Sequence, residues 1–567
     1  MNMARSGKPR IGTPEVLFGL SVGVLVIVVA VPMLLIFFNA FWVDGHFNVA
    51  DVLKVLRRQE TYKALMNSLV LSAGVTVTGT IVGTFFAWLV TRTDLPFKKT
   101  MKLLFLVPFM LPAFIGALAW KMLLSPRAGY INRFFIDVLG FDGPIFDIYT
   151  YAGIILVETM YLFPFVFIQV SGALERMDPT LEESARISGA DLLTITRRIT
   201  IPLVLPSILS GSLLIMLYSM AHFGTVAVLG IETGIYNIPT LIYEKIHQSA
   251  GSFDSIRAAT VLATVLVIAA ALILWLQNRI LRKGRYQIIA GKSFRPTELK
   301  LRVWRIPLFL FCIAYIAFTI VLPTATIFMV GGLKTYGLPF TAANLTFANY
   351  HHILFEWDLT RDAIWNSISL GLSAALITMF AGVIISYVIV KMKVRGRGLL
   401  EFLGMLPFSV PGSVIALGVI LAWSGKFGIN LYNTVWIILL AYIARYMAFS
   451  LKANSAALEQ VHDSLVEAAR ASGATMGQAL RDIVVPLVRP GMVAAFFLIF
   501  LPALRELTVS VLLYGPTTRT IGVAIYTLNE DGETVYSAAL AGIALIIIVL
   551  GEVLIKRLVS GKTHSQG

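Results

Sequence analysis

The chain has 567 residues, of which 57% are hydrophobic and only 14% are charged. Because soluble proteins carry roughly 25% charged residues, this composition excludes an ordinary soluble enzyme and indicates a membrane protein. The formal net charge of +15 at pH 7 does not indicate nucleic-acid binding, since the basic residues gather between long apolar segments, where lipid headgroups explain them better.

Apolar segments of about 20 residues recur along the chain, and each is long enough to cross a hydrocarbon layer of roughly 30 Å. The first exceeds the roughly 7–15 apolar residues of a removable signal peptide, so we expect it to remain as a span. We therefore predict an all-α integral membrane protein with about 12 spans. In chain order they lie near residues 16–43, 64–91, 102–124, 148–173, 201–229, 258–279, 306–330, 362–390, 400–423, 434–452, 490–514 and 536–555.

Most of the 46 Lys and Arg residues lie at the two termini and in alternate loops. Cytoplasmic loops of membrane proteins are enriched in these residues, so we predict that both termini are cytoplasmic. Residues 286–305 belong to a strongly basic segment without apolar periodicity, which indicates a linker that rests on anionic lipid.

The sequence contains an internal repeat, because loop 174–202 aligns with loop 458–486 at a constant offset of 284 residues. The repeat divides the chain into a first six-helix unit (1–285), the linker (286–305) and a second six-helix unit (306–567). Since six is an even number of spans, both copies enter the membrane with the same orientation. We expect a parallel repeat with a pseudo-twofold axis along the membrane normal.

A second match lies in the third span of each unit. Val107–Pro112 corresponds to Leu406–Pro411 at an offset of 299 residues, so the outer loop near 125–147 is about 15 residues longer than its partner.

The repeated cytoplasmic loop has the residues of a short surface helix. Asp178 and Pro179 predict its start, and Glu182 and Glu183 place negative charge in its first turn, where it complements the helix dipole. Gly189 suits the left-handed residue that ends such a helix.

A second helix is expected from about Asp191 to Thr200, and Asp463 is expected to cap the helix in the second copy. A simple elbow between spans is the alternative, but an elbow does not need this length, glycine and charge pattern twice.

The pattern Glu-Ser/Ala-Ala-Arg-x-Ser-Gly-Ala in both loops resembles the "EAA" loop of permeases of binding-protein-dependent ABC importers with the type I fold. In that family the loop is a coupling helix that docks on an ATPase subunit, and here only Ser184 departs from the pattern. The resemblance implies contacts with two ATPase subunits and with a periplasmic or lipid-anchored binding protein, in the bacterial cytoplasmic (inner) membrane. The residues expected to contact the ATPases are Glu183, Ala185, Gly189, Glu467, Ala469 and Gly473.

Two short segments, 291–293 and 561–563, are similar to the end of a phosphate-binding loop. That motif requires a glycine five positions earlier, where this chain has Tyr286 and Lys556, so both matches are due to chance. We expect no catalytic residue and no cofactor in this chain, and expect ATP and Mg²⁺ to bind to the partner ATPase.

Charged residues inside spans are costly and usually face a cavity or a partner. The candidates for a translocation path or gate are Glu158, His222, Arg445, Arg505 and Glu506. The repeat relates His222 to Glu506 and Tyr161 to Arg445, so we expect equivalent positions to face each other across the axis. The alternative is local pairing between helices that serves stability alone.

No metal-ligand spacing is present, and the neighbouring His351 and His352 are interpreted as surface residues of an outer loop. The segments from His222 to Gly230 and from Arg505 to Gly515, on a tandem-fused plan, are similar to ferric-iron importers. Thiamine, polyamine and phosphonate permeases are the alternatives within the class. A secondary transporter with 12 helices is the main rival from another class, and a channel or structural membrane protein is a third.

Overall fold

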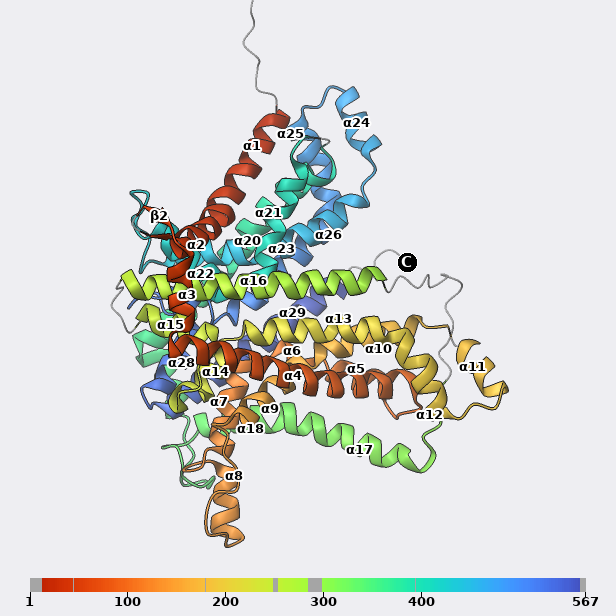
Figure 1. The fold of residues 1–567 in the computed structure, drawn as a ribbon, viewed down its shortest axis with the longest axis vertical. Helices are drawn as coiled ribbons and strands as arrows, with labels where there is room; N and C mark the ends of the chain where they lie inside the picture. The colour runs from red at the N-terminus through yellow and green to blue at the C-terminus, as the bar shows by residue number, and fades with distance from the viewer. Residues whose placement is uncertain are drawn as a thin grey trace, which may run out of the picture. The chain divides into compact units, whose positions relative to one another are not determined.

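The computed structural model describes residues 13–43, 45–178, 180–247, 253–283, 298–392 and 394–560, and these residues are mainly helical (Figure 1). Within them, nine helices are long and apolar enough to cross a membrane, and three bent helix pairs raise the number to twelve if each pair is one span. The predicted all-α fold class and the predicted number of spans are confirmed.

The six spans of the first half are α1–η1–α2 (Thr13–Leu25, Val26–Ala30, Val31–Phe41), α4 (Gln59–Arg92), α5–α6–α7 (Lys98–Leu104, Val107–Met110, Ala113–Leu124), α9–α10 (Tyr151–Leu162, Pro164–Arg176), α12–η3–α13 (Leu192–Ile195, Thr196–Thr200, Ile201–Met220) and α16 (Phe253–Lys283). Shorter elements of this half are β1 (Trp42–Val43), β2 (His46–Phe47), α3 (Val49–Arg57), α8 (Tyr130–Arg133), η2 (Phe134–Val138), α11 (Thr180–Ile187), α14 (Gly224–Leu229), η4 (Ile231–Thr233) and α15 (Ile238–His247).

The spans of the second half are α17–η6–α18 (Arg305–Ile316, Ala317–Val321, Leu322–Gly331), α20 (Asp358–Val390), α21–α22 (Arg397–Ser409, Gly412–Trp423), α23 (Val435–Glu459), α25–η8–α26 (Met476–Ala479, Leu480–Val484, Val485–Leu504) and α29 (Thr534–Ser560). Its shorter elements are η5 (Arg302–Trp304), α19 (Ala348–His351), η7 (His352–Glu356), α24 (Asp463–Ala471), α27 (Ser510–Leu513) and α28 (Ile521–Glu530).

Two predicted spans are longer than the helices that the structure contains. The helix predicted over 201–229 ends at Met220, and the helix predicted over 490–514 ends at Leu504. In the second case the Glu506 carboxylate accepts a hydrogen bond from the backbone N–H of Val509 (2.9 Å). A side chain that binds the backbone in this way starts a new turn and competes with continuation of the helix.

By their contacts, the described residues form two compact units. Unit 1 lies within Met1–Asn48, Trp357–Ala524 and Ile546–Gly567, and unit 2 lies within Val49–Glu356 and Ile525–Leu545. The first span of each sequence half therefore packs in the unit that holds most of the other half. The boundaries predicted from the repeat, at 1–285, 286–305 and 306–567, stay a prediction. Most of the linker lies outside the described residues.

In unit 2, aromatic side chains pack α17, the first span of the second half, against helices of the first half. Tyr315 of α17 lies against Phe86 of α4, with ring centroids 4.6 Å apart, and 5.6 Å from Phe163. Phe86 also stacks on Phe105 at 4.3 Å. Aromatic pairs at these separations add to the stabilisation from burial, so the seventh span is an integral part of this core.

In unit 1, the first span of the first half (α1–η1–α2) packs closely against helices of the second half. α2 contacts α22, and α1 contacts α20 and α21. A side chain at Gly418 would meet the backbone of Pro32, with Cβ 2.9 Å from its carbonyl oxygen. Such close approach of two helices requires a residue without a side chain.

The third span is sharply bent in both units, by 91° between Met110 and Ala113 and by 117° between Ser409 and Gly412. The residue before a proline is driven from the helical into the extended region. Leu111 (ψ 143°) and Val410 (ψ 127°) both have extended backbones, and each precedes a proline of the matched motif. The motif that aligned the two halves therefore produces the bend.

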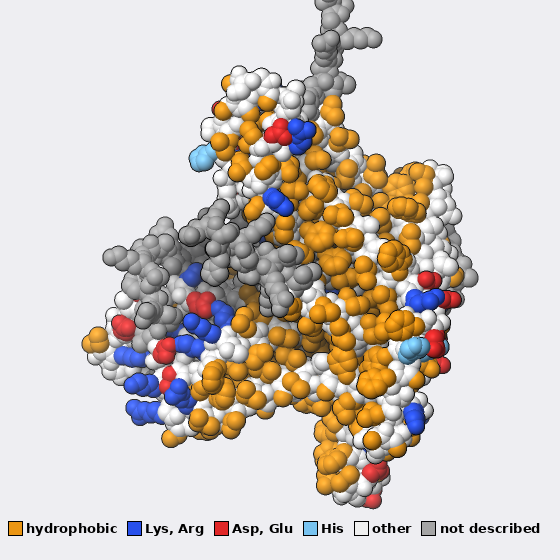
Figure 2. All heavy atoms as spheres, turned by 180° about the vertical axis from the view of Figure 1, so that it is seen from behind, with side chains coloured by type: hydrophobic (Ala, Val, Ile, Leu, Met, Phe, Trp, Pro, Cys, Tyr) orange, Lys and Arg blue, Asp and Glu red, His pale blue; other side chains and the backbone are white. Residues whose placement is uncertain are grey.

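Side chains on the surface separate by type. Figure 2 shows hydrophobic side chains over most of the face that it draws, and Lys and Arg side chains gathered around the ends of α5, α12 and α17. The exposed basic residues on or beside these ends include Lys99, Arg197, Arg198 and Arg302. This distribution suits helices that face lipid and end at a polar boundary.

Candidate functional site

Both coupling-loop helices end in the same backbone arrangement. Gly189 (φ +84°) is left-handed, as predicted, and Gly473 (φ +90°) has the same conformation in the second copy. Ala190 N–H donates to the Ala185 carbonyl and Gly189 N–H donates to the Arg186 carbonyl, at 3.0 and 2.9 Å. The second copy repeats both bonds, from Ala474 to Ala469 and from Gly473 to Arg470. This pair of hydrogen bonds is a Schellman motif, which ends each helix sharply.

The predicted ATPase-contact residues lie on the accessible side of these helices. Glu183 and Glu467 are exposed, and Ala185 and Ala469 are half-buried. Leu181 and Leu465, related by the repeat, are 49% and 45% exposed. The two helices thus present carboxylates beside apolar side chains, and their role in docking stays a prediction.

The first coupling helix is fixed to the end of the second span by a buried ion pair. Arg92, the last residue of α4, pairs with Glu182 of α11, and their side chains are only 1% and 5% exposed. The Thr200 hydroxyl donates a 2.6 Å hydrogen bond to the same carboxylate. Sequence analysis assigned Glu182 only to the helix dipole and missed this pair.

The second coupling helix contacts the equivalent end of α20 through a more exposed pair, whose acid lies at a different position of the loop. Lys391 Nζ lies 2.7 Å from Asp463 Oδ1 and also donates to the Val461 carbonyl at 2.5 Å. The prediction that Asp463 caps α24 is wrong, because His462 is the N-cap residue and Asp463 begins the helix. In the first copy, Asp178 does accept a hydrogen bond from Thr180 N–H (2.9 Å), whereas Pro179 lies outside the described residues.

The helix predicted from Asp191 to Thr200 is not separate from the fifth span. It starts at Leu192, passes through a π-helical turn at Thr196–Thr200 and continues directly into α13. The second half has the same turn at Leu480–Val484. A proline follows each turn by two residues and lacks the N–H that regular helix geometry needs, which explains the shared irregularity.

Of the predicted path residues, Glu158 and His222 contact each other in unit 2. His222 Nδ1 lies 2.9 Å from Glu158 Oε1, and the Ser219 hydroxyl donates to the other carboxylate oxygen at 2.5 Å. Glu158 is 1% exposed. The interaction joins the fourth span to the end of the fifth.

Arg445 and Glu506 contact each other in unit 1. Arg445 Nε lies 3.1 Å from Glu506 Oε2, and Tyr446 donates a hydrogen bond to the same oxygen at 3.0 Å. This pair also joins the fourth span to the end of the fifth, but here the carboxylate lies at the end of the fifth span, whereas Glu158 lies in the fourth. Arg505, directly before Glu506, is half-buried at the end of α26. Local pairing is therefore real in both units, and the expectation that these positions face each other across the axis stays a prediction.

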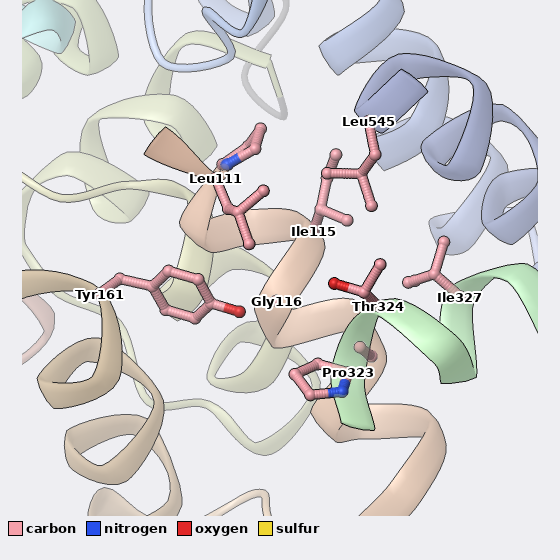
Figure 3. Close-up of a pocket in the computed structure, with 10 residues that line it drawn as sticks. Leu111, Ile115, Gly116, Tyr161, Pro323, Thr324, Ile327 and Leu545 are labelled. Carbon is pink, nitrogen blue, oxygen red and sulfur yellow. The ribbon is translucent and has the colours of Figure 1, made fainter. Parts of the chain in front are cut away.

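A narrow cavity lies at the bend of the third span in unit 2, and Tyr161 points into it (Figure 3). Its volume is about 10 Å³, which suits about one water molecule. A side chain at Gly116 would overlap the Tyr161 hydroxyl, and one at Gly412 would overlap the Arg445 guanidinium. Tyr161 and Arg445, which the repeat relates, thus both contact the part of the third span that follows its bend. The cavity is lined by Leu111, Pro112, Ile115, Gly116, Ala119, Tyr161, Pro323, Thr324, Ile327 and Leu545.

The two adjacent histidines of the outer loop bind one carboxylate. His351 Nδ1 and His352 Nδ1 lie 3.0 and 2.9 Å from the two oxygens of Glu356. These contacts, first that of His352, hold the pKa of Glu356 below its usual value. In the described part of the chain, no group of three or more His, Cys, Asp or Glu residues could hold a metal ion.

With this geometry established, comparison with known proteins shows the family. Residues 79–285 and 374–564 each match the family described as "binding-protein-dependent transport system inner membrane component". The chain belongs to this family. It is a tandem-fused permease of the binding-protein-dependent ABC importer class with the type I fold, as the EAA resemblance implied.

Relatives match this permease over nearly its whole length. The ferric transport system permease protein FbpB of Actinobacillus pleuropneumoniae is 29% identical over 548 residues, which cover 94% of this chain and 76% of that protein. The Fe(3+)-transport system permease protein FbpB 2 of Haemophilus influenzae is 24% identical over 530 residues, which cover 93% of this chain and 96% of that protein.

Two partial matches are also present. The putative 2-aminoethylphosphonate transport system permease protein PhnV of Salmonella typhi is 30% identical over 190 residues, 33% of this chain and 71% of that protein. A chain of a bacterial alginate ABC transporter, solved in complex with an alginate pentasaccharide-bound periplasmic protein, covers 49% of this permease and 96% of its own length, with 19% identity and a TM-score of 0.40.

The two loop helices of this permease were predicted from the sequence, but the basic residues that anchor them were missed. Arg92 and Lys391 are related by the offset of 299 residues found in the third span, so the alignment contained the signal. Their contact with the coupling helices depends on how the chain folds back, which a linear alignment does not show.

Proposed function

We propose that this permease forms the transmembrane path of an ATP-driven importer and that two separate ATPase subunits dock on α11 and α24. The observation that carries this proposal is the matched pair of surface helices, with exposed Glu183 and Glu467 and identical glycine ends. In this proposal, ATP and Mg²⁺ bind to the ATPase subunits and not to the permease. Both termini lie in the cytoplasm, as the distribution of Lys and Arg favours.

The proposed substrate is ferric iron, delivered by a periplasmic or lipid-anchored binding protein. Two of the relatives that match nearly the whole chain are named for ferric or Fe(3+) transport, which supports this choice. The alternative within the class is a phosphonate, supported by the partial match of 30% identity to PhnV. Thiamine and polyamines are the remaining alternatives.

The test is reconstitution of the permease in lipid vesicles with its ATPase subunits and binding protein. We expect vanadate-sensitive, ATP-dependent uptake of labelled Fe³⁺, and no uptake of thiamine, polyamine or 2-aminoethylphosphonate. ATP-dependent uptake of one of those compounds instead would refute the iron proposal and leave the importer intact. Uptake that follows a cation gradient without ATP would refute the importer and favour the secondary transporter.

We also propose that Glu158, His222, Arg445, Arg505 and Glu506 line the path or its gate. Buried ionisable groups within spans usually mark such a path. In each unit one such contact joins the fourth span to the end of the fifth, and its fifth-span members, His222 and Glu506, are related by the repeat. Import is measured for His222→Ala and Glu506→Gln in complexes whose ATP hydrolysis is intact. Loss of uptake with preserved hydrolysis is expected, and normal uptake in both variants would leave these pairs with a purely structural role.

A further inference from the structure

The second span of each half ends in a basic residue that reaches the coupling loop of the same half. Arg92 contacts Glu182 in unit 2, and Lys391 contacts Asp463 in unit 1. The two basic residues occupy equivalent positions at the offset of 299 residues. The basic residue is therefore shared by the repeat, whereas its acidic partner is not, since the loop offset of 284 relates Glu182 to Val466 and Asp463 to Pro179.

The two contacts differ in burial, and burial decides how rigid they are. The side chains of Arg92 and Glu182 are 1% and 5% exposed, whereas those of Lys391 and Asp463 are 13% and 64% exposed. Charges that are removed from water interact more strongly than exposed ones, and separating a buried pair leaves an uncompensated charge. Exposed pairs add little to stability. The first coupling helix is therefore tied to its span more firmly than the second.

The guanidinium of Arg92 depends on this one partner. Within the described residues, neither Nη1 nor Nη2 forms a hydrogen bond of normal geometry, so the Glu182 charge is what compensates its burial. Thr200 holds the same carboxylate from the start of the fifth span. A displacement of α11 that keeps this ion pair must move the end of α4 with it.

The same end of α4 also holds the start of the seventh span. Leu299 N–H donates to the Arg92 carbonyl at 2.8 Å, and Asp94 N–H donates to the Leu299 carbonyl at 3.1 Å. The Asp94 carboxylate accepts a further bond from Leu301 N–H at 2.8 Å. Residues 92–94 are therefore a junction between the coupling helix, the second span and the chain that leads into α17.

We propose that Arg92 is a positioning residue for transport, which transmits displacement of α11 to the second span and, through the junction, to the seventh span. Lys391 is its weaker counterpart in the other unit. The inference rests on the proposed docking of ATPase subunits on α11 and goes beyond it, because it assigns the residue through which docking acts on the membrane segments.

The test uses the full permease assembled with its ATPase subunits and binding protein in vesicles. The readout is the number of substrate molecules imported per ATP hydrolysed, which a residue with only a structural role would not change. We expect Arg92→Gln to lower this ratio about tenfold, within the roughly 5–150-fold range of coupling between sites. Arg92→Lys is expected to restore part of the ratio. Lys391→Gln is expected to lower it by less than about twofold, since exposed pairs contribute little.

Two further variants keep the proposal falsifiable if Arg92→Gln does not fold. The double variant Arg92→Met with Glu182→Met replaces both charges with apolar groups, a change that often preserves stability. It should assemble and hydrolyse ATP but import with the same low ratio as Arg92→Gln. The matched control is Lys98→Gln, which removes an exposed pair with Glu298 near the same junction and should leave the ratio unchanged.

A normal import ratio in the assembled double variant would overturn the proposal, as would an equal loss in Lys98→Gln. These results differ from failure of the proposed function, which would appear as ATP-independent uptake by the unmodified permease.

Discussion

Gly473 ends α24 in the left-handed conformation, with φ of +90° and open space where a side chain would lie. An L-residue at this φ costs about 1–2 kcal/mol, since its Cβ approaches the following carbonyl. Alanine is also about 0.8–1 kcal/mol better than glycine inside a helix, so both terms favour continuation of α24 over the sharp end. Together the two terms are about 2–3 kcal/mol, so we expect Gly473→Ala to shift this local equilibrium by a factor of about 20–150.

The effect is measured at two levels in the assembled importer. Ala474 N–H, which donates to the Ala469 carbonyl at 3.0 Å, should lose protection from hydrogen exchange in Gly473→Ala. Uptake should fall in the order Gly, Asn, Ala, Val at position 473, because asparagine tolerates the left-handed region and valine does not. Gly189→Ala should behave like Gly473→Ala, since Gly189 ends α11 with φ of +84°.

The matched control is Gly477→Ala in α25, where an added Cβ meets nothing within 4 Å and φ is not positive. It should leave uptake and exchange unchanged. Full uptake and full protection of Ala474 in both Gly473→Ala and Gly473→Val would refute the reasoning, because the helix end would then tolerate a side chain that the backbone geometry forbids.

Three further predictions concern packing and charge. Gly116→Ala should lower stability by roughly 1–3 kcal/mol, because the added methyl overlaps the rigid ring of Tyr161; an unchanged melting temperature in detergent would contradict this contact. Arg445→Met leaves the Glu506 carboxylate, which is 7% exposed, without its cation and should lower the free energy of unfolding by up to about 3 kcal/mol. Adding Glu506→Gln to the same chain should recover most of this loss, which a double-mutant cycle would measure. The neighbouring imidazoles of His352 and His351 lower the pKa of Glu356 below its usual 4.5, so their stabilising effect is present above pH 4.5 and is lost as the pH falls through the lowered pKa. The difference in melting temperature between the unmodified protein and Glu356→Gln should therefore shrink over that range. A difference that stays constant with pH would contradict this prediction.

Most of the fold could be predicted because lipid imposes a simple rule on the sequence. A segment that crosses the bilayer must be long, apolar and helical, so counting such segments recovered twelve spans near their observed places. The rule does not say where a helix breaks within an apolar segment. The ends at Met220 and Leu504 depend on local hydrogen bonds of residues such as Glu506, which apolar length does not report.

The coupling helices could be predicted for a different reason. Their glycine ends are local features that the backbone alone requires, so Gly189 and Gly473 could be assigned from the sequence. The buried partner of Glu182 could not, because Arg92 lies 90 residues earlier and meets it only after the third and fourth spans have folded back. Burial of one of two adjacent glutamates is likewise decided by the packed structure.

In each compact unit, the first span of one half of the sequence packs with helices of the other half, and this arrangement bears on how motion of α11 and α24 would spread. Unit 2 contains α11 together with α17, the first span of the second half, and unit 1 contains α24 together with α1 and α2, the first span of the first half. In unit 2, a displacement of α11 would therefore reach spans from both halves of the sequence inside a single compact unit. In unit 2 the route is visible atom by atom, from Glu182 through Arg92 to Leu299. Loss of one partner of a buried pair leaves an uncompensated charge, whereas an exposed charge stays solvated, so α11 is expected to be more sensitive than α24 to loss of its anchor.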